Sequence, residues 1–278
     1  MGAGNIVDPP VFVEGLLADR AALVTGGGSG IGFGIAGCLA RYGAKVAIAS
    51  RSMERLEAAA AELEKRFGSP VLPVEMNVRE PDSVRTAVTH VAQALGTLDI
   101  LVNNAAGNFY SPSEDLSPNG WRAVLETDLY GTFFGCQAAF PIMKAQGFGR
   151  IVSTSMTLHY KGWPQMAHAT AAKAGVDALT RTLALEWASH GITVNAVAPG
   201  PIPTEGVKKA FTPPSDEIPD MFDVSRATEA YARKAIPLGR MGDPEDIGNM
   251  VTYLVSPAGD WITGAIFVVD GGEWLLKT

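Results

Sequence analysis

Cysteine is scarce in this chain, and its histidines are not spaced as metal ligands. The 278 residues include only Cys38 and Cys136, with no Cys-x-x-Cys pattern. The four histidines, at positions 90, 159, 168 and 190, form neither His-x-x-x-His nor His-Glu-x-x-His. Disulfide frameworks and zinc sites need such clusters. We therefore expect a reducing compartment, no disulfide framework and no metal site.

Positive charge and long apolar runs are also limited. Lysine and arginine total 22 against 29 acidic residues, so the net charge of −7 argues against nucleic-acid binding. No run reaches 18 apolar residues, and the chain shows neither a secretory signal at its start nor an S-K-L type peroxisomal address at its end. The sequence therefore predicts a cytoplasmic location and no binding to membranes or nucleic acid.

Apolar residues and glycine, by contrast, are abundant. Apolar residues make up 47% and charged residues 18%, with a mean hydropathy of +0.13, so the chain can bury a large core. No change in composition marks a second domain, and we predict one domain over residues 1–278. The 31 glycines are about 11% of the chain against a usual ~7%, without a repeat, and so need positional explanations.

Short apolar runs alternate with helical patterns along the chain. The runs are continuously apolar, which is typical of parallel strands buried on both faces. We expect strands at 21–24, 46–49, 71–76, 98–102, 151–153, 193–197 and 265–269. Helices are expected at about 30–43, 52–68, 81–95, 117–146 (as two helices), 167–190 and 244–255. This order predicts an α/β fold, a Rossmann-type doubly wound sheet of about seven parallel strands flanked by helices.

Residues 199–235 depart from this alternation. Six prolines lie between Pro199 and Pro219, mixed with charged residues and little periodicity. Long loops in compact domains are usually functional or disordered. We predict a substrate lid at about 201–235, with a surface connection without function as the alternative.

A glycine-rich turn, Thr25-Gly-Gly-Gly-Ser-Gly-Ile-Gly32, joins the first expected strand to the first helix. A side chain at Gly26, Gly30 or Gly32 would keep the backbone away from a pyrophosphate, and the helix N-terminus attracts anions. This strand–turn–helix context favours nucleotide binding over a tight turn alone. The expected cofactor contacts in this turn are Gly26, Ser29, Gly30, Ile31 and Gly32.

The end of the second expected strand indicates which nucleotide is bound. An Asp or Glu there binds the ribose 2′-hydroxyl of NAD, but this chain has Ser50 and Arg51. A hydroxyl and a guanidinium suit a 2′-phosphate. The sequence therefore predicts NADPH as the cofactor; the alternative is that Arg51 is only a solvated residue at a helix start.

Four further motifs accompany the glycine-rich turn. They are Asn103-Asn-Ala-Ala-Gly107, Lys173 within Ala-Ala-Lys-Ala-Gly, Asn195 to Gly200 and Asp270-Gly-Gly272. Together they resemble the short-chain dehydrogenase/reductases over nearly the whole chain. The resemblance implies further cofactor contacts at Asn77, Val78, Asn104, Ala105, Ala106, Lys173, Pro199, Gly200 and Ile202.

The proton-handling residues of that family are replaced in this chain. In the family a Tyr four residues before the Lys and an upstream Ser act on a carbonyl oxygen, with a supporting Asn. The matching positions here hold Ala169, Met156 and Asp128. Because Ala and Met can neither donate nor accept a proton, ordinary alcohol–ketone chemistry lacks its general acid.

One branch of the family shares these departures. The segments Asn103 to Phe109, Ser111-Pro112 and Leu116-Ser-Pro118 resemble the 2,4-dienoyl-CoA reductases, and His168-Ala169 with Asp128 most resembles their peroxisomal form. The resemblance implies an NADPH-dependent oxidoreductase that converts a 2,4-dienoyl-CoA to a 3-enoyl-CoA in unsaturated fatty-acid oxidation. It also implies a homotetramer.

The resemblance assigns roles to individual residues as well. Asn108 would bind the thioester oxygen, and Lys173 would hold the nicotinamide ribose. Asp128 and Asp177 would position Lys173 and an ordered water that supplies the proton. For Asp177 the alternative is an ordinary acid–base pair along one helix. The acyl-CoA would contact Arg55, Arg79, Asn108, Phe109, Ser111 and Ser117, with Lys208 and Lys209 as weaker candidates.

Two other functions fit the same residues. In a trans-2-enoyl-CoA or other α,β-unsaturated carbonyl reductase, the hydride goes to the β-carbon. Because Ala169 and Met156 replace the proton-handling side chains, a catalytically silent NADP(H)-binding protein is a third hypothesis.

Overall fold

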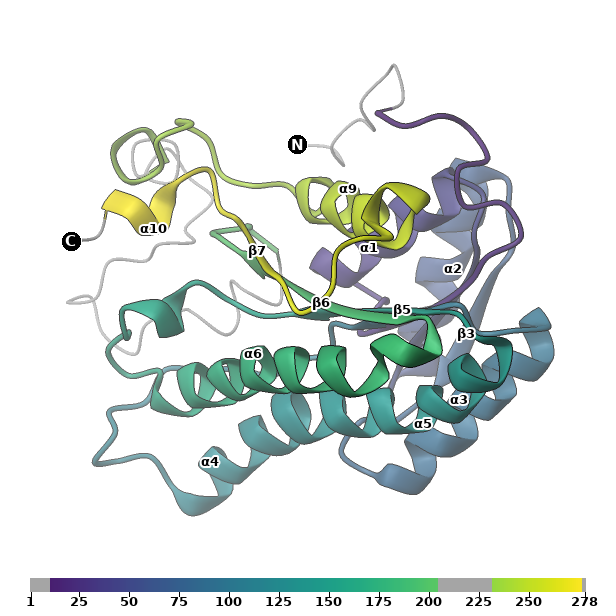
Figure 1. Ribbon diagram of the computed structural model, residues 1–278. Helices are drawn as coiled ribbons and strands as arrows, with labels where there is room; N and C mark the ends of the chain where they lie inside the picture. Colours follow the sequence, from purple (N-terminus) through teal and green to yellow (C-terminus); the bar gives the residue numbers. More distant parts are fainter. Residues whose placement is uncertain (1–10, 205–231, 277–278) are drawn as a thin grey trace.

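One parallel sheet forms the centre of the molecule (Figure 1). The computed structural model describes residues 11–204 and 232–276. The strands are β1 (Ala21–Thr25), β2 (Lys45–Ser50), β3 (Val71–Glu75), β4 (Ile100–Asn103), β5 (Gly149–Thr154), β6 (Ile192–Pro199) and β7 (Ile266–Val269). They lie in the order β3-β2-β1-β4-β5-β6-β7, so the chain winds outward from β1 in both directions. The predicted doubly wound sheet of seven parallel strands is confirmed.

Helices connect the strands, and local signals set several of their ends. They are α1 (Gly30–Arg41), α2 (Met53–Phe67), α3 (Pro81–Leu95), α4 (Pro118–Leu125), α5 (Gly131–Gln146), α6 (Ala167–Trp187), α9 (Pro244–Val255) and α10 (Glu273–Leu276). Ser52 Oγ caps α2 by accepting from the N–H of Arg55, and Gly68 ends that helix in left-handed backbone. α3 and α9 have the predicted bounds, because proline at a first helical position loses no helical hydrogen bond.

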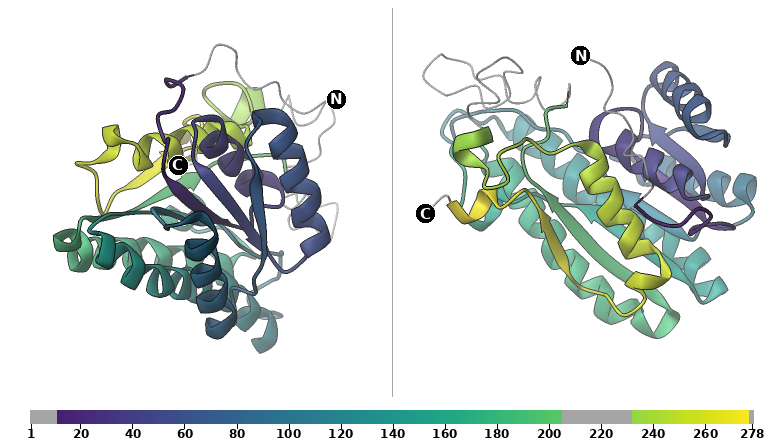
Figure 2. Two further views of the ribbon diagram at one scale, coloured as in Figure 1. Left: turned by 90° about the vertical axis from the view of Figure 1, so that its right-hand side faces the viewer. Right: turned by 90° about the horizontal axis from the view of Figure 1, so that it is seen from above.

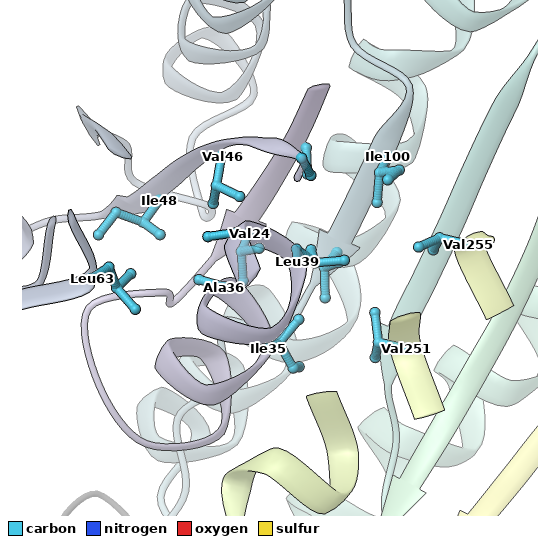
Figure 3. Packing of buried hydrophobic residues seen from close by; sticks show 14 of the residues in the cluster. Val24, Ile35, Ala36, Leu39, Val46, Ile48, Leu63, Ile100, Val251 and Val255 are labelled. Atoms are coloured by element: carbon cyan, nitrogen blue, oxygen red, sulfur yellow. The ribbon is translucent and has the colours of Figure 1, made fainter. Parts of the chain in front are cut away.

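The helices cover both faces of the sheet. α1, α2 and α9 lie on one face, and α3, α5 and α6 lie on the other (Figure 1 and Figure 2). Successive strand residues point to opposite sides, so Val24 packs in one core and Leu23 in the other. Figure 3 shows the first core, where Ile35 of α1 and Val251 of α9 pack together. With both faces buried, the strand ends are left for ligands.

The two helices predicted between residues 117 and 146 run into one another without a break. α4 passes into a π turn, η1 (Glu126–Tyr130), and then into α5, with helical backbone at both junctions. π turns within α-helices are frequent at functional sites. This one carries Asp128, which is buried.

Short turns and the C-terminal helix complete the fold. Within residues 11–204 and 232–276, the 3-10 turns are η2 (Leu158–Tyr160), η3 (Ala188–His190) and η4 (Pro257–Gly259). α10 was not predicted. The expected lid at 201–235 falls largely outside the described residues, and so do Lys208 and Lys209. None of the helices in the described ranges is long and apolar enough to cross a bilayer.

Candidate active site

A pocket of about 810 Å³ opens at the carboxyl ends of the strands. Doubly wound sheets bind ligands at this edge, beside the point where the strand order reverses. All residues predicted to contact the cofactor line this one pocket: Gly26, Ser29, Gly30, Ile31, Gly32, Ser50, Arg51, Asn77, Val78, Asn104, Ala105, Ala106, Lys173, Pro199, Gly200 and Ile202.

The turn after β1 presents backbone to the pocket. Gly26 has a φ of +68°, and a Cβ on it would lie 3.0 Å from Cα of Ala105. A Cβ on Gly32 would collide with the carbonyl oxygen of Gly26. The Ser29 side chain does not cap α1, so the first N–H groups of this helix are available to an anion. These residues fit the pyrophosphate of a dinucleotide.

The pocket is cationic beside the end of β2. Arg51 and Arg55 both line it, and Arg51 forms no ion pair with any residue of the described ranges. β2 ends in Ser50, followed by Arg51, without a carboxylate of its own, and Glu75, which pairs with Ser50 on β3, does not line the pocket. The arrangement therefore suits a phosphate group next to the adenosine ribose.

A buried ion pair lies deeper in the pocket. Lys173 Nζ is 3.4 Å from Oδ2 of Asp128 and donates a hydrogen bond of 2.7 Å to the carbonyl oxygen of Thr154. Asp128 Oδ1 accepts from the N–H of Gly107 at 2.8 Å. Burial raises the pKa of Asp128, although Lys173 and the Gly107 N–H act in the opposite direction. This carboxyl can therefore hold a proton at a higher pH than an exposed Asp.

Neither the family's Tyr position nor its Ser position, which hold Ala169 and Met156 here, places a hydroxyl in the pocket. Ala169 is buried beside Val124 and Ala172, and Met156 packs against the same cluster while lining the pocket. Asp128 and Lys173, which line the same pocket, can handle protons there. Direct protonation of a substrate oxygen by a Tyr four residues before the Lys is therefore excluded here.

Asp177 does not position Lys173 in this structure, which corrects that expectation. Its carboxylate accepts from Ser155 Oγ at 2.5 Å and lies 2.7 Å from Nε2 of His159. Tyr160 Oη donates to it at 3.4 Å. Although Lys173 and Asp177 are one helical turn apart, each side chain pairs with a different neighbour. Asp177 thus anchors the segment 155–160, whose first four residues line the pocket.

The residues assigned to the substrate separate into two groups. Arg55, Arg79, Asn108 and Phe109 line the pocket. Ser111 and Ser117 do not: Ser117 Oγ instead caps α4 by accepting from the N–H of Gly120, and Ser111 Oγ donates to the Pro112 carbonyl. Serines in turns often bind local backbone in this way. The structure thus gives no support for a contact between either serine and the substrate.

Asn108 combines an engaged oxygen with an available donor. Its Oδ1 accepts from the N–H of Phe109 at 2.9 Å, and its Nδ2 donates to no acceptor in the part of the chain that the structure describes. The Phe109 ring, 37% exposed, meets the buried ring of His168 edge-on at 4.5 Å between centroids. An amide donor and an aromatic wall therefore stand together at the pocket.

Sequence reasoning missed several pocket residues. Tyr110, Trp163, Thr204 and Glu273 also line the cavity. Glu273 is buried on α10, which only the tertiary fold brings to the pocket. No local pattern marks it. Thr25 does not line the pocket, but its Oγ1 accepts from the N–H groups of Asn104 and Ala105, both at 2.9 Å, and so holds two residues that do.

Comparison with known proteins assigns the family. The family model described as enoyl-(acyl carrier protein) reductase matches residues 26–273. The chain is 41% identical over 266 residues to the peroxisomal 2,4-dienoyl-CoA reductase [(3E)-enoyl-CoA-producing] of Danio rerio, covering 95% of this chain and 85% of the relative. A probable 2,4-dienoyl-CoA reductase [(2E)-enoyl-CoA-producing] of Bacillus subtilis is 40% identical over 261 residues, covering 92% and 97%.

Solved structures agree with this assignment. Levodione reductase superposes with a TM-score of 0.86 at 31% identity, covering 94% of this chain and 99% of that one. A putative short-chain alcohol dehydrogenase of Sinorhizobium meliloti gives 0.84 at 37% identity, covering 93% and 98%. The fold, the glycine turn and the relatives agree. The chain therefore belongs to the short-chain dehydrogenase/reductase family, is similar to the 2,4-dienoyl-CoA reductases, and is an oxidoreductase that acts on CH–CH bonds.

Proposed function

We propose that this protein reduces 2,4-dienoyl-CoA thioesters to 3-enoyl-CoA with NADPH. The observation that carries the proposal is the buried Lys173–Asp128 pair in a pocket whose family hydroxyl positions hold Ala169 and Met156. Without that Tyr or Ser hydroxyl, the pocket cannot protonate a ketone oxygen as other members of the family do. It suits a reaction in which the proton goes to carbon.

NADPH, when bound, supplies the hydride for the reaction. The substrate would gain a hydride at the far carbon of the diene and a proton on the carbon next to the thioester, so negative charge would develop on the thioester oxygen. Asn108 Nδ2 would donate to the oxygen as its charge develops. Lys173, oriented by Asp128, would hold the nicotinamide ribose and a water that delivers the proton.

The choice of NADPH rests on Ser50 and Arg51 at the end of β2. A guanidinium there neutralises a 2′-phosphate, whereas NADH offers only hydroxyls at this position. A cytoplasmic location and a role in unsaturated fatty-acid oxidation stay predictions.

The test is the oxidation of NADPH with hexa-2,4-dienoyl-CoA and with the matching trans-2-enoyl-CoA. We expect turnover of the dienoyl thioester, with 3-enoyl-CoA identified as the product by chromatography. Turnover of the 2-enoyl thioester alone would instead support an enoyl-CoA reductase. Tight NADPH binding without turnover of either substrate or of ketones would support a catalytically silent protein. A 2-enoyl product from the dienoyl thioester would contradict the assigned regiochemistry.

A further inference from the structure

An ion pair joins the pocket rim to the π turn. Arg79, in the loop after β3, donates from Nε to Oε2 of Glu126 at 2.8 Å, and its Nη2 contacts the same oxygen. The arginine side chain is 40% exposed and that of the glutamate 24%. Arg79 lines the pocket, and Glu126 is the first residue of η1. The pair is therefore accessible to a ligand in the pocket.

The other cations of the pocket have different surroundings. Its lysine and arginine residues within the described ranges are Arg51, Arg55, Arg79 and Lys173. Lys173 is buried against Asp128, while Arg51 and Arg55 flank the end of β2, where the cofactor phosphate is expected. Arg79 is thus the pocket cation best placed to bind an anion other than the cofactor phosphate. The carboxylate of Glu126 already pairs with it.

The loop that carries Arg79 is itself held in place. Asn77 Oδ1 accepts from the N–H of Arg79 at 3.2 Å, and Asn77 Nδ2 donates to Glu80 at 2.7 Å. Val78 packs so tightly on Gly131 that a Cβ on the glycine would lie 2.9 Å from Cβ of Val78. The loop and the helix therefore stay together when the ion pair opens, and only the two side chains need to move.

We infer that Glu126 is a specificity-determining residue that competes with the phosphates of an acyl-CoA for Arg79. The inference rests on the proposed function, since it needs a phosphorylated thioester in the pocket. A phosphate displaces the carboxylate because it accepts more hydrogen bonds from a guanidinium. A thioester without phosphates leaves the pair closed. Glu126 thus weakens the binding of CoA, and the effect increases with the strength of the Glu126–Arg79 ion pair.

The experiment compares two ligands on four variants. Calorimetry at low salt, with NADPH bound, measures the Kd of coenzyme A and of pantetheine, which lacks the phosphates. We expect Glu126→Gln to tighten the binding of coenzyme A about 1.5- to 5-fold, in the range of an exposed ion pair, and to leave that of pantetheine unchanged. Arg79→Gln should weaken coenzyme A, and adding Glu126→Gln to it should then have no effect.

Asp82→Asn is the matched control, because it removes an acidic partner from the exposed Asp82–Arg85 pair on α3. It should change neither Kd. Equal shifts for both ligands, tightening that persists without Arg79, or a shift with Asp82→Asn would each overturn the inference. If the wild type turns over the dienoyl thioester but Glu126→Gln has no effect, only the inference fails. If no variant binds coenzyme A and the wild type does not turn over the dienoyl thioester, the proposed function fails with it.

Discussion

The cost of burying charge organises the site at the residue scale. Asp128 is 2% exposed and Lys173 is 5% exposed. An isolated buried ion costs several kcal/mol, so each depends on the other and on hydrogen bonds from the backbone. Removing only one partner would leave the other uncompensated. Asp128 and Lys173 therefore support each other in a pocket where the family's Tyr and Ser positions hold Ala169 and Met156.

Arg51 is expected to set cofactor preference. Arg51→Asp removes the cation for a 2′-phosphate and adds a carboxylate for the NADH ribose. Charge-assisted hydrogen bonds contribute about 1.5–3 kcal/mol, so NADPH affinity should fall about 10- to 100-fold, while NADH affinity rises. Fluorescence titration of both cofactors measures the ratio. Lys45→Asp, at the exposed opposite end of β2, should leave it unchanged. An unaltered ratio in Arg51→Asp would refute the assignment.

His168 is expected to make the free energy of unfolding decrease as the pH falls. Its ring is fully buried, and burial lowers its pKa from 6.5. Just below pH 6.5 the unfolded chain therefore binds a proton at this histidine, whereas the folded chain binds it only at a lower pH. Stability from this group is complete above pH 6.5 and is lost as the pH falls below it, by at most about 1.4 kcal/mol per pH unit.

Urea unfolding between pH 7.5 and 5.5 tests this prediction. His168→Gln should lower stability overall but flatten its dependence on pH. His90→Asn, at an exposed position on α3, should keep the wild-type slope. An equally steep slope in His168→Gln would show that other groups control the acid response.

At the scale of elements, small residues bring helices and loops into register. α1 and α9 approach so closely that a Cβ on Gly34 would collide with Pro244, and one on Gly248 would lie 3.0 Å from the Gly34 carbonyl oxygen. On the other side of the sheet, Asp177 on α6 fixes the segment 155–160 through Ser155 and His159. Elements that meet this closely move only as units.

Gly34→Ala should therefore destabilise the protein, although Ala favours helices. Overpacking costs about 1–3 kcal/mol, whereas replacing Gly by Ala in a helix gains only about 1 kcal/mol. The collision with Pro244 places the cost in the upper part of its range, so the net effect is a loss of stability. We expect a lower midpoint of urea unfolding. Glu57→Ala, on the exposed surface of α2, should stay within about 0.5 kcal/mol of the wild type. A stabilised Gly34→Ala would mean that α9 can shift away.

At the scale of the whole molecule, apolar surface lies at one edge of the sheet. Among the described strands β7 pairs with β6 alone, and its residues are only partly buried. Nearby, Trp261 is 99% exposed and Leu185 is 85% exposed. The two segments adjoin, since a Cβ on Gly264 would lie 3.4 Å from Cβ of Ala184. Edges of this kind favour association with another chain.

We expect a homotetramer of about four times 29.2 kDa in solution. Trp261→Glu combined with Leu185→Glu should place charges in one interface and yield a smaller species. Light scattering coupled to size exclusion measures the mass. Glu57→Lys, an exposed change of charge on α2, should leave the assembly intact. A monomeric wild type would contradict the expected tetramer.

The sequence by itself determined the strand order along the chain, the bounds of α3 and α9, and the glycine turn at the pocket. These depend on apolar periodicity, proline and capping, which act within a few residues. Only the tertiary structure decided which groups pair with Asp177 and Arg79, and that α10 brings Glu273 to the pocket. Those contacts join segments far apart in sequence, and a charged side chain takes whichever partner the packed fold places beside it.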